Sequence, residues 1–258
     1  MARPSGRGIK GRQDALEAEH RPEVIRQRLR AQNKHSYLGD AVLGGIDGCV
    51  TTFAVVAGAV GGGFSSFVVI VLGFANLIAD GFSMAISNYQ STKSQQEQVD
   101  EARRSEEEQI QQYPEGEREE IRQIFSAKGF EGAVLEQVVE VITQDRTLWV
   151  NTMLTEELGL QVESPSPLRA GLTTFGAFLL VGLFPLLPFV VPGVEPAIVF
   201  PISSLITAIA FFGVGLAKGV VLKRSALRSG LETLLMGGGA AVLAYLVGFW
   251  LRQTFGAV

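Results

Sequence analysis

Charge is almost absent from three long stretches of the sequence, and this pattern predicts the fold class. Residues 41–90 contain two formally charged side chains, residues 170–217 contain one, and residues 233–251 contain none. A helix needs about 20 predominantly apolar residues to cross a bilayer. A large soluble α-helical core is disfavoured, because uncharged runs of this length are uncommon in soluble helices. We therefore expect five membrane helices, at residues 41–62, 66–90, 170–191, 196–217 and 232–251.

The segment between the second and third predicted membrane helices has a different composition. Residues 91–163 contain 17 Asp and Glu against 7 Lys and Arg, a net charge of −10. Proline at helix starts and glycine after helix ends indicate short helices in this segment. We place them at residues 95–112, 115–127, 131–143 and 146–158.

The fold class predicted from these patterns is an all-α membrane protein with five transmembrane helices and one helical insert. We expect a basic leader at residues 1–39, two membrane helices within 40–92, an acidic metal-binding domain at 93–163, and three membrane helices within 164–258. The leader lacks the apolar stretch of a signal peptide, so the first membrane helix is expected to direct insertion.

The distribution of basic residues predicts the topology. Residues 1–39 contain nine Lys and Arg, and the loop at residues 218–228 contains four. The positive-inside rule places both segments in the cytoplasm. The insert then lies in the cytoplasm as well, and the C-terminus lies outside. Because membrane helices follow the leader directly, a topology signal or contact with lipid is favoured over nucleic-acid binding.

Carboxylates within the predicted membrane helices are the first candidates for function. Asp47 lies inside the first helix, and Asp40 precedes it by seven residues, on about the same face. In the second helix, Asn76, Asp80 and Met84 recur every four residues and form one stripe. A charge at bilayer depth costs about 2.5–3.5 kcal/mol, so such residues usually mark a transport path. The alternative for Asp47 is a helix cap.

The insert contains a second set of candidates, three pairs of ligand-type side chains that each share one helix face. Carboxylates that converge from several helices form an oxygen-rich cation site, and a thioether shifts its preference from Mg²⁺ or Ca²⁺ to a softer transition metal. The alternative is a solvated acidic face, as most charge runs are. The pairs are Glu106 and Gln109, Glu117 and Glu120, and Met153 and Glu157.

Several classes of enzyme and pump are disfavoured. The only histidines, His20 and His35, precede the first membrane helix, so Glu-x-x-His di-iron sites and zinc hydrolase sites are not expected. The sequence has no Gly-Lys-Ser/Thr phosphate loop, which argues against an ATP-driven pump. We therefore expect a protein that is not an enzyme.

Three segments of the chain resemble the vacuolar iron transporter family. Residues 39–48 (GDAVLGGIDG) resemble its first helix, and residues 79–85 (ADGFSMA) with the following Lys93-Ser94 resemble its second. Residues 149–160 (WVNTMLTEELGL) resemble the end of its cytoplasmic metal-binding domain. The order and spacing of these motifs match over about residues 35–255.

The resemblance implies a homodimer with five membrane helices per subunit. The family moves Fe²⁺, and often Mn²⁺, out of the cytosol in exchange for protons. Asp47 and Met84 match its membrane pathway, and Asp40 lies near the cytoplasmic entrance. The family's cytoplasmic metal ligands match Glu106, Glu117, Glu120, Met153 and Glu157.

The sequence departs from the family pattern at three positions. Asn76 stands where a glutamate is expected, and Asp80 lies one turn further on. Gln109 also replaces a glutamate, with Glu108 beside it, and Leu154 replaces the second methionine of a pair. We include Asn76 and Asp80 in the predicted path and Glu108 among the predicted metal ligands.

The sequence thus predicts an exporter of Fe²⁺ or Mn²⁺ with no fixed cofactor, and Zn²⁺ or Co²⁺ are further candidates at the cytoplasmic site. Its expected partners are divalent metal ions, protons, the lipid bilayer and a second copy of the chain, and no nucleic acid. We favour a bacterial inner membrane, or the vacuolar membrane in a eukaryote. The alternatives are a membrane-anchored metal sensor or storage protein, and a transporter of another cation with a regulatory calcium-type site in the insert.

Overall fold

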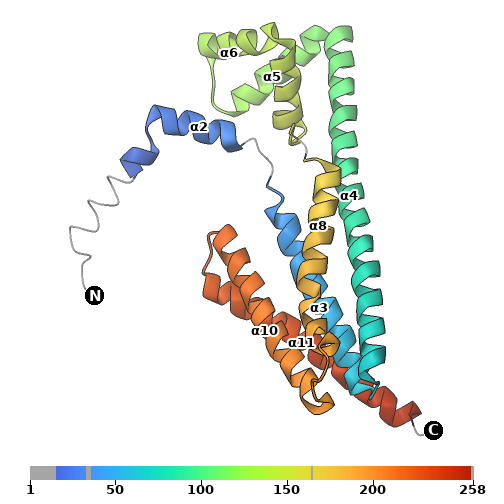
Figure 1. Ribbon diagram of the computed structural model, residues 1–258. Helices are drawn as coiled ribbons and strands as arrows, with labels where there is room; N and C mark the ends of the chain where they lie inside the picture. The colour runs from blue at the N-terminus through green and yellow to red at the C-terminus, as the bar shows by residue number, and fades with distance from the viewer. Residues whose placement is uncertain (1–15, 33–35, 164, 257–258) are drawn as a thin grey trace. The chain divides into compact units, whose positions relative to one another are not determined.

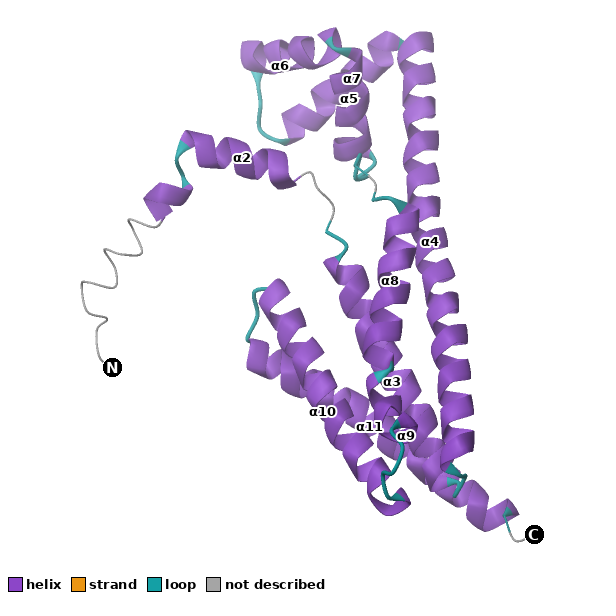
Figure 2. Ribbon diagram, viewed as in Figure 1, coloured by secondary structure: helices purple, strands orange, loops and turns teal. Residues whose placement is uncertain are grey.

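The computed structural model describes residues 16–32, 36–163 and 165–256, and the rest of the predicted basic leader lies outside these ranges. The chain divides into two units, residues 1–36 and 37–258. The first unit contains the basic helix α2 (Pro22–Gln32). In both units the described elements are helices joined by loops, without a strand (Figure 2).

The second unit contains five segments that are long and apolar enough to cross a membrane, and this finding confirms the predicted number of spans. The helix α3 packs against α4, α8 and α11, and α10 packs against α11 (Figure 1). The third segment consists of α8, a short 3₁₀ turn and α9. The membrane elements are α3 (Leu38–Gly61), α4 (Ser66–Gln112), α8 (Pro167–Gly182), α9 (Leu187–Val190), α10 (Pro196–Val221) and α11 (Ala226–Phe255).

The insert between α4 and α8 has an apolar core of its own. The fully buried Ile121, Val139, Val150 and Leu154 come from four different elements and form the centre of this core. Proline at the first position of α5 and the positive φ of Gly129 set the helix boundaries. The elements are α5 (Pro114–Ala127), α6 (Gly132–Gln144), α7 (Arg146–Thr152) and the π-helix η1 (Met153–Glu157).

The helix α4 is longer than the sequence pattern predicted. We expected one helix to end near residue 90 and another to begin near residue 95, but the structure has a single helix of 47 residues. Residues 91–112 contain no glycine or proline and are rich in Gln, Glu and Arg, which favour helix. The change in polarity therefore marks the end of the apolar segment, and the polar part extends about 33 Å beyond it at 1.5 Å per residue.

Two glycines allow the backbones of α3 and α8 to touch. A Cβ atom added at Gly44 would lie 2.3 Å from the Thr174 carbonyl oxygen, and one at Gly48 would lie 2.4 Å from the Phe178 carbonyl oxygen. Small residues at such crossings let membrane helices approach closely and gain van der Waals contact. This contact fixes the position of Asp47, which directly precedes Gly48.

The close contact between α3 and α8 predicts that adding one methyl group at Gly48 lowers the stability of the protein. We expect Gly48→Ala to destabilise the protein by about 1–3 kcal/mol, because the helices must separate to admit the Cβ atom. Gly176→Ala in α8 is the matched control, since nothing lies within 4 Å of a Cβ atom there. Thermal unfolding of both variants in detergent measures the difference. Equal melting temperatures for the two variants would contradict the close contact.

Candidate functional site

Four glutamates from three elements of the insert lie close enough to repel one another. Glu106 is in α4, Glu117 and Glu120 are in α5, and Glu157 ends η1. Glu106 and Glu117 are each only 4% exposed, whereas Glu120 and Glu157 are exposed. We call these four residues the acidic cluster. It therefore has a buried side and a side that is open to solvent.

Burial and mutual repulsion raise the pKa of three carboxyl groups in the acidic cluster. Burial raises the pKa of Glu106 to about 7, and the charges of Glu157 and Glu120 add to this effect. Burial, followed by repulsion from Glu120, Glu106 and Glu157, likewise raises the pKa of Glu117 to about 7. The pKa of Glu157 is raised by burial and by Glu120. A bound cation would relieve this repulsion and favour the ionised forms.

One buried oxygen in each of two cluster residues has no hydrogen-bond partner within the described part of the chain. These atoms are the Oε2 oxygens of Glu106 and Glu117. Buried polar atoms are normally paired, and an exception calls for an explanation such as an ion. The two oxygens therefore fit a cation that would bind between α4 and α5.

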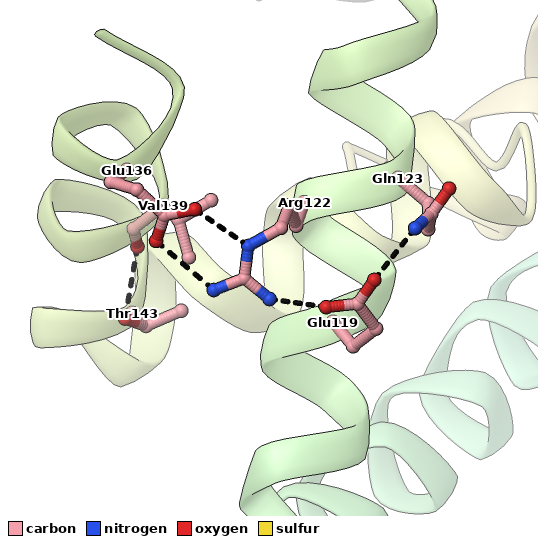
Figure 3. Close-up of polar contacts among 6 residues, drawn as sticks. All are labelled: Glu119, Arg122, Gln123, Glu136, Val139 and Thr143. Carbon is pink, nitrogen blue, oxygen red and sulfur yellow. Dashed lines mark hydrogen bonds and ion pairs between the residues drawn. The ribbon is translucent and has the colours of Figure 1, made fainter. Parts of the chain in front are cut away.

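A clamp between α5 and α6 holds the helix that carries Glu117 and Glu120. Arg122 donates from Nε to Glu136 Oε1 at 2.8 Å and from Nη2 to Glu136 Oε2 at 3.1 Å (Figure 3). Its Nη1 donates to Glu119, which also accepts a 2.6 Å hydrogen bond from Gln123. The bidentate geometry orients both helices, and the partners of Arg122, Glu136 and Glu119, do not belong to the acidic cluster.

Other basic side chains of the insert also have partners outside the acidic cluster. Two of them tie α7 to α4, and the third ties α5 to η1. These basic groups therefore hold the frame of the insert and do not pair with the carboxylates of the cluster. These contacts are Arg103 to Asn151 Oδ1 at 2.9 Å, Arg146 to the Glu107 carbonyl oxygen at 2.7 Å, and the ion pair of Lys128 with Glu156.

The π-helix η1 positions the last candidate ligands. Asp145 caps α7 by accepting hydrogen bonds from the backbone N–H groups of Thr147 and Leu148. The chain then widens into the π-turn, in which the N–H of Leu158 donates to the Met153 carbonyl oxygen at 3.2 Å. Such turns are often found at functional sites. The π-turn was not predicted from the sequence, since no residue type specifies it.

The structure brings only part of the predicted metal site into the acidic cluster. Met153 is fully buried in the apolar core of the insert, together with Leu154. Glu108 is exposed, about 200° around α4 from Glu106 at 100° per residue. Gln109 is exposed and donates to Ser105 at 3.1 Å. Glu108 therefore lies apart from the cluster.

The described residues do not form a closed coordination sphere. Among them, no three His, Cys, Asp or Glu side chains lie close enough together to hold a metal ion. The four carboxylates of the acidic cluster are thus near one another without sharing one point. To bind one ion, several of these carboxylates would have to move closer together.

A second acidic pair lies in the apolar helices. Asp47 of α3 and Asp80 of α4 interact electrostatically, and both are half-buried. The Nδ2 atom of Asn76, one turn from Asp80, is buried without a partner among the described residues. Met84 packs against the apolar core that surrounds Phe178. Of the predicted path residues, Asp47 of α3 and Asp80 of α4 therefore lie close enough to interact.

The structure adds a residue that the sequence analysis missed. Asn88 donates a 2.8 Å hydrogen bond to Asp40 Oδ1 and a 2.7 Å hydrogen bond to Thr174 Oγ1. A signal was present, because Asn88 continues the four-residue spacing of Asn76, Asp80 and Met84. Asparagine is common at membrane helix contacts and does not by itself indicate a path.

Comparison with known proteins identifies the family. The model of the VIT family matches residues 38–249. The chain belongs to the VIT family. It is 32% identical to a vacuolar iron transporter of Toxoplasma gondii over 95% of this chain and 86% of that protein. It is 34% identical to vacuolar iron transporter 1 of Arabidopsis thaliana over 80% of this chain and 82% of that protein. These matches confirm the resemblance inferred from the three motifs.

Family membership and the five apolar helices identify an integral, multi-pass membrane protein. A relative from Eucalyptus grandis, also called vacuolar iron transporter 1, is 31% identical over 85% of this chain and 90% of that protein. The likeness thus includes both the membrane helices and the insert between them.

The raised pKa values predict how stability depends on pH. The native protein holds protons on Glu106 and Glu117 up to about pH 7, whereas the unfolded chain releases them near pH 4.5. Between these values the native state binds more protons, so stability falls as the pH rises. We expect the melting temperature of the metal-free protein to fall between about pH 5 and pH 8.

A pair of variants tests the origin of this slope. Glu117→Gln imitates the protonated side chain and should make the decline shallower. Glu108→Gln, an exposed change on α4, is the control and should keep the wild-type slope. If the melting temperatures of Glu117→Gln and wild type fell in parallel with rising pH, the buried Glu117 carboxylate would not be the cause of the decline.

Proposed function

We propose that this protein exports Fe²⁺ or Mn²⁺ from the cytosol in exchange for protons. The observation that carries the proposal is the pairing of Asp47 and Asp80 on two adjacent apolar helices. Relatives named as vacuolar iron transporters support iron as the cargo. Manganese is a cation of similar ligand preference.

The chemistry of a carboxylate in an apolar environment provides the exchange. Desolvation favours the protonated acid, while a bound cation favours the ionised form. Asp47 and Asp80 can therefore hold either protons or a metal ion, and binding of one releases the other. Met84 and the amide of Asn76 would replace part of the hydration shell of the ion. Asp40 would meet the ion at the entrance of the path.

The insert would collect the metal on the cytosolic side. Its net charge of −10 raises the local concentration of cations. The acidic cluster would bind the ion through Glu106, Glu117, Glu120 and Glu157, with Zn²⁺ and Co²⁺ as further candidates. Met153 is buried in the apolar core of the insert, so its side chain would have to turn toward the cluster for its thioether to favour a transition metal. We propose no ligand role for the exposed Glu108.

The proposed assembly is a homodimer with its N-termini in the cytoplasm and its C-termini outside. Asp47 and Asp80 are half-buried within one subunit. A second copy would cover the exposed parts of these side chains and shield the path from lipid. In this proposal, residues 1–39 form the cytoplasmic leader and residues 93–163 form the cytoplasmic metal-binding domain.

Metal flux into sealed proteoliposomes tests the transport function. We expect uptake of Fe²⁺ and Mn²⁺ that rises with an imposed pH gradient and falls at least tenfold in Asp47→Asn, because the amide keeps the shape but cannot exchange a proton for a metal. Glu195→Gln, at the start of α10, is the matched control and should transport normally. Metal binding without flux under every condition would instead indicate a sensor or storage protein.

The insert's choice of metal gives a second test. We expect a large excess of Ca²⁺ to leave Mn²⁺ bound to wild type and to displace it from Met153→Leu, because a thioether adds little for a hard cation. Leucine and methionine have similar volumes, so the fold should be retained. The exposed Met236 in α11 provides the control substitution, Met236→Leu. Equal displacement from both variants would remove Met153 from the site.

A further inference from the structure

Three helices meet in one hydrogen-bonded group at the end of the membrane segments from which the insert projects. The Nδ2 atom of Asn88 in α4 donates to Asp40 Oδ1 in α3 at 2.8 Å and to Thr174 Oγ1 in α8 at 2.7 Å. The three side chains are at least partly buried. Both hydrogens of one amide group are thus used, each on a different helix.

The backbone on either side holds this group rigidly. A Cβ atom at Gly44 would lie 2.3 Å from the Thr174 carbonyl oxygen, which places α3 directly on α8. A Cβ atom at Gly171 would lie 2.8 Å from the Ala85 carbonyl oxygen, which places α4 on the same helix within one turn of Asn88. The Asn88 amide is therefore held by packed helices rather than by a loop, and it has a defined distance from Asp40.

The hydrogen bonds also have a defined direction. Thr174 donates its own hydrogen to the Ala170 carbonyl oxygen at 3.1 Å, so its oxygen is left to accept from Asn88. The amide nitrogen of Asn88 can only donate, and its second hydrogen is directed at Asp40. A donor aimed at a carboxylate oxygen fixes the orientation of that carboxylate.

We propose that Asn88 is a positioning residue, which holds the Asp40 carboxylate in the orientation that receives the divalent cation at the entrance of the membrane path. The proposal rests on the transport function proposed above. Asn88 acts through Asp40, whereas its bond to Thr174 takes no part in capture, because the packed helices already hold the amide. If Asn88 only tied the helices together, losing its bond to Asp40 and losing its bond to Thr174 would affect metal uptake equally. A positioning role predicts that only loss of the bond to Asp40 weakens uptake.

The test uses initial rates of Mn²⁺ uptake into proteoliposomes as a function of Mn²⁺ concentration. Asn88→Leu keeps the approximate size and removes the donor, and we expect the half-saturating concentration to rise about tenfold, with the maximal rate within twofold of wild type. Thr174→Val breaks only the bond to α8 and should stay within twofold in both parameters. Asn88→Ala provides a second variant of the same kind.

The double variant Asn88→Leu/Asp40→Ala shows whether Asn88 acts through Asp40. We expect it to match Asp40→Ala alone, because no carboxylate is left to orient. The proposal would be overturned if the two substitutions raised the half-saturating Mn²⁺ concentration independently in the double variant. It would also be overturned if Thr174→Val raised that concentration as much as Asn88→Leu. Misfolding of both Asn88 variants, seen by size-exclusion chromatography while Thr174→Val folds, would also overturn it in favour of a packing role.

The outcomes for Asn88 and for transport are separable. Absence of Mn²⁺ uptake by the wild-type protein would refute the transport function itself. Normal wild-type uptake, impaired by Asp40→Ala but unchanged by Asn88→Leu, would refute the role of Asn88 and leave the transport function standing.

Discussion

One uninterrupted helix, α4, fixes the distance between the two acidic sites. Asp80 and Glu106 are both in this helix, and their separation of 26 positions corresponds to about 39 Å at 1.5 Å per residue. No glycine or proline follows Gly81 before the helix ends, so the helix has no obvious hinge. In the proposed function, a metal ion captured in the insert would therefore have to travel along α4, or α4 would have to move as one body.

The same helix explains why Glu106 is buried. The membrane part of α4 buries Gly73, Leu77 and Gly81 at four-residue spacing, and its extension buries Val99 and Glu106 seven residues apart. One face of α4 is thus packed along most of its length, first against α8 and then against the insert. Glu106 occupies a position where an apolar residue would stabilise the insert, and the raised pKa is the consequence. A buried carboxylate without a basic partner is a cost that a cation-binding role would explain.

The sequence predicts the membrane helices well because the bilayer imposes a length and excludes charge. It predicts the continuity of α4 poorly, since polarity reports the solvent around a helix and not where its backbone ends. The acidic cluster shows a similar limit. Spacing on one helix places Glu117 with Glu120, but the burial of Glu106 depends on how the insert folds back on α4. Glu108 is two residues from Glu106 in the sequence and yet lies on another face of α4. The hydrogen bonds of Asn88 to Asp40 and Thr174 depend on how α3 and α8 pack against α4, which its spacing on α4 does not specify.

The amide side chain of Asn76, on the same stripe of α4 as Asp80, has a consequence for charge balance. An amide cannot take up or release a proton near neutral pH, so Asp47 and Asp80 are the only carboxylates left in the apolar parts of α3 and α4. Two ionised carboxylates neutralise one divalent cation, and two protons neutralise the same pair when the cation has left. In the proposed mechanism each state of the path is therefore electrically neutral, which avoids the cost of a net charge at bilayer depth. Asp80 lies one turn closer to the insert than Asn76, so this balance is reached nearer to the entrance held by Asp40 and Asn88.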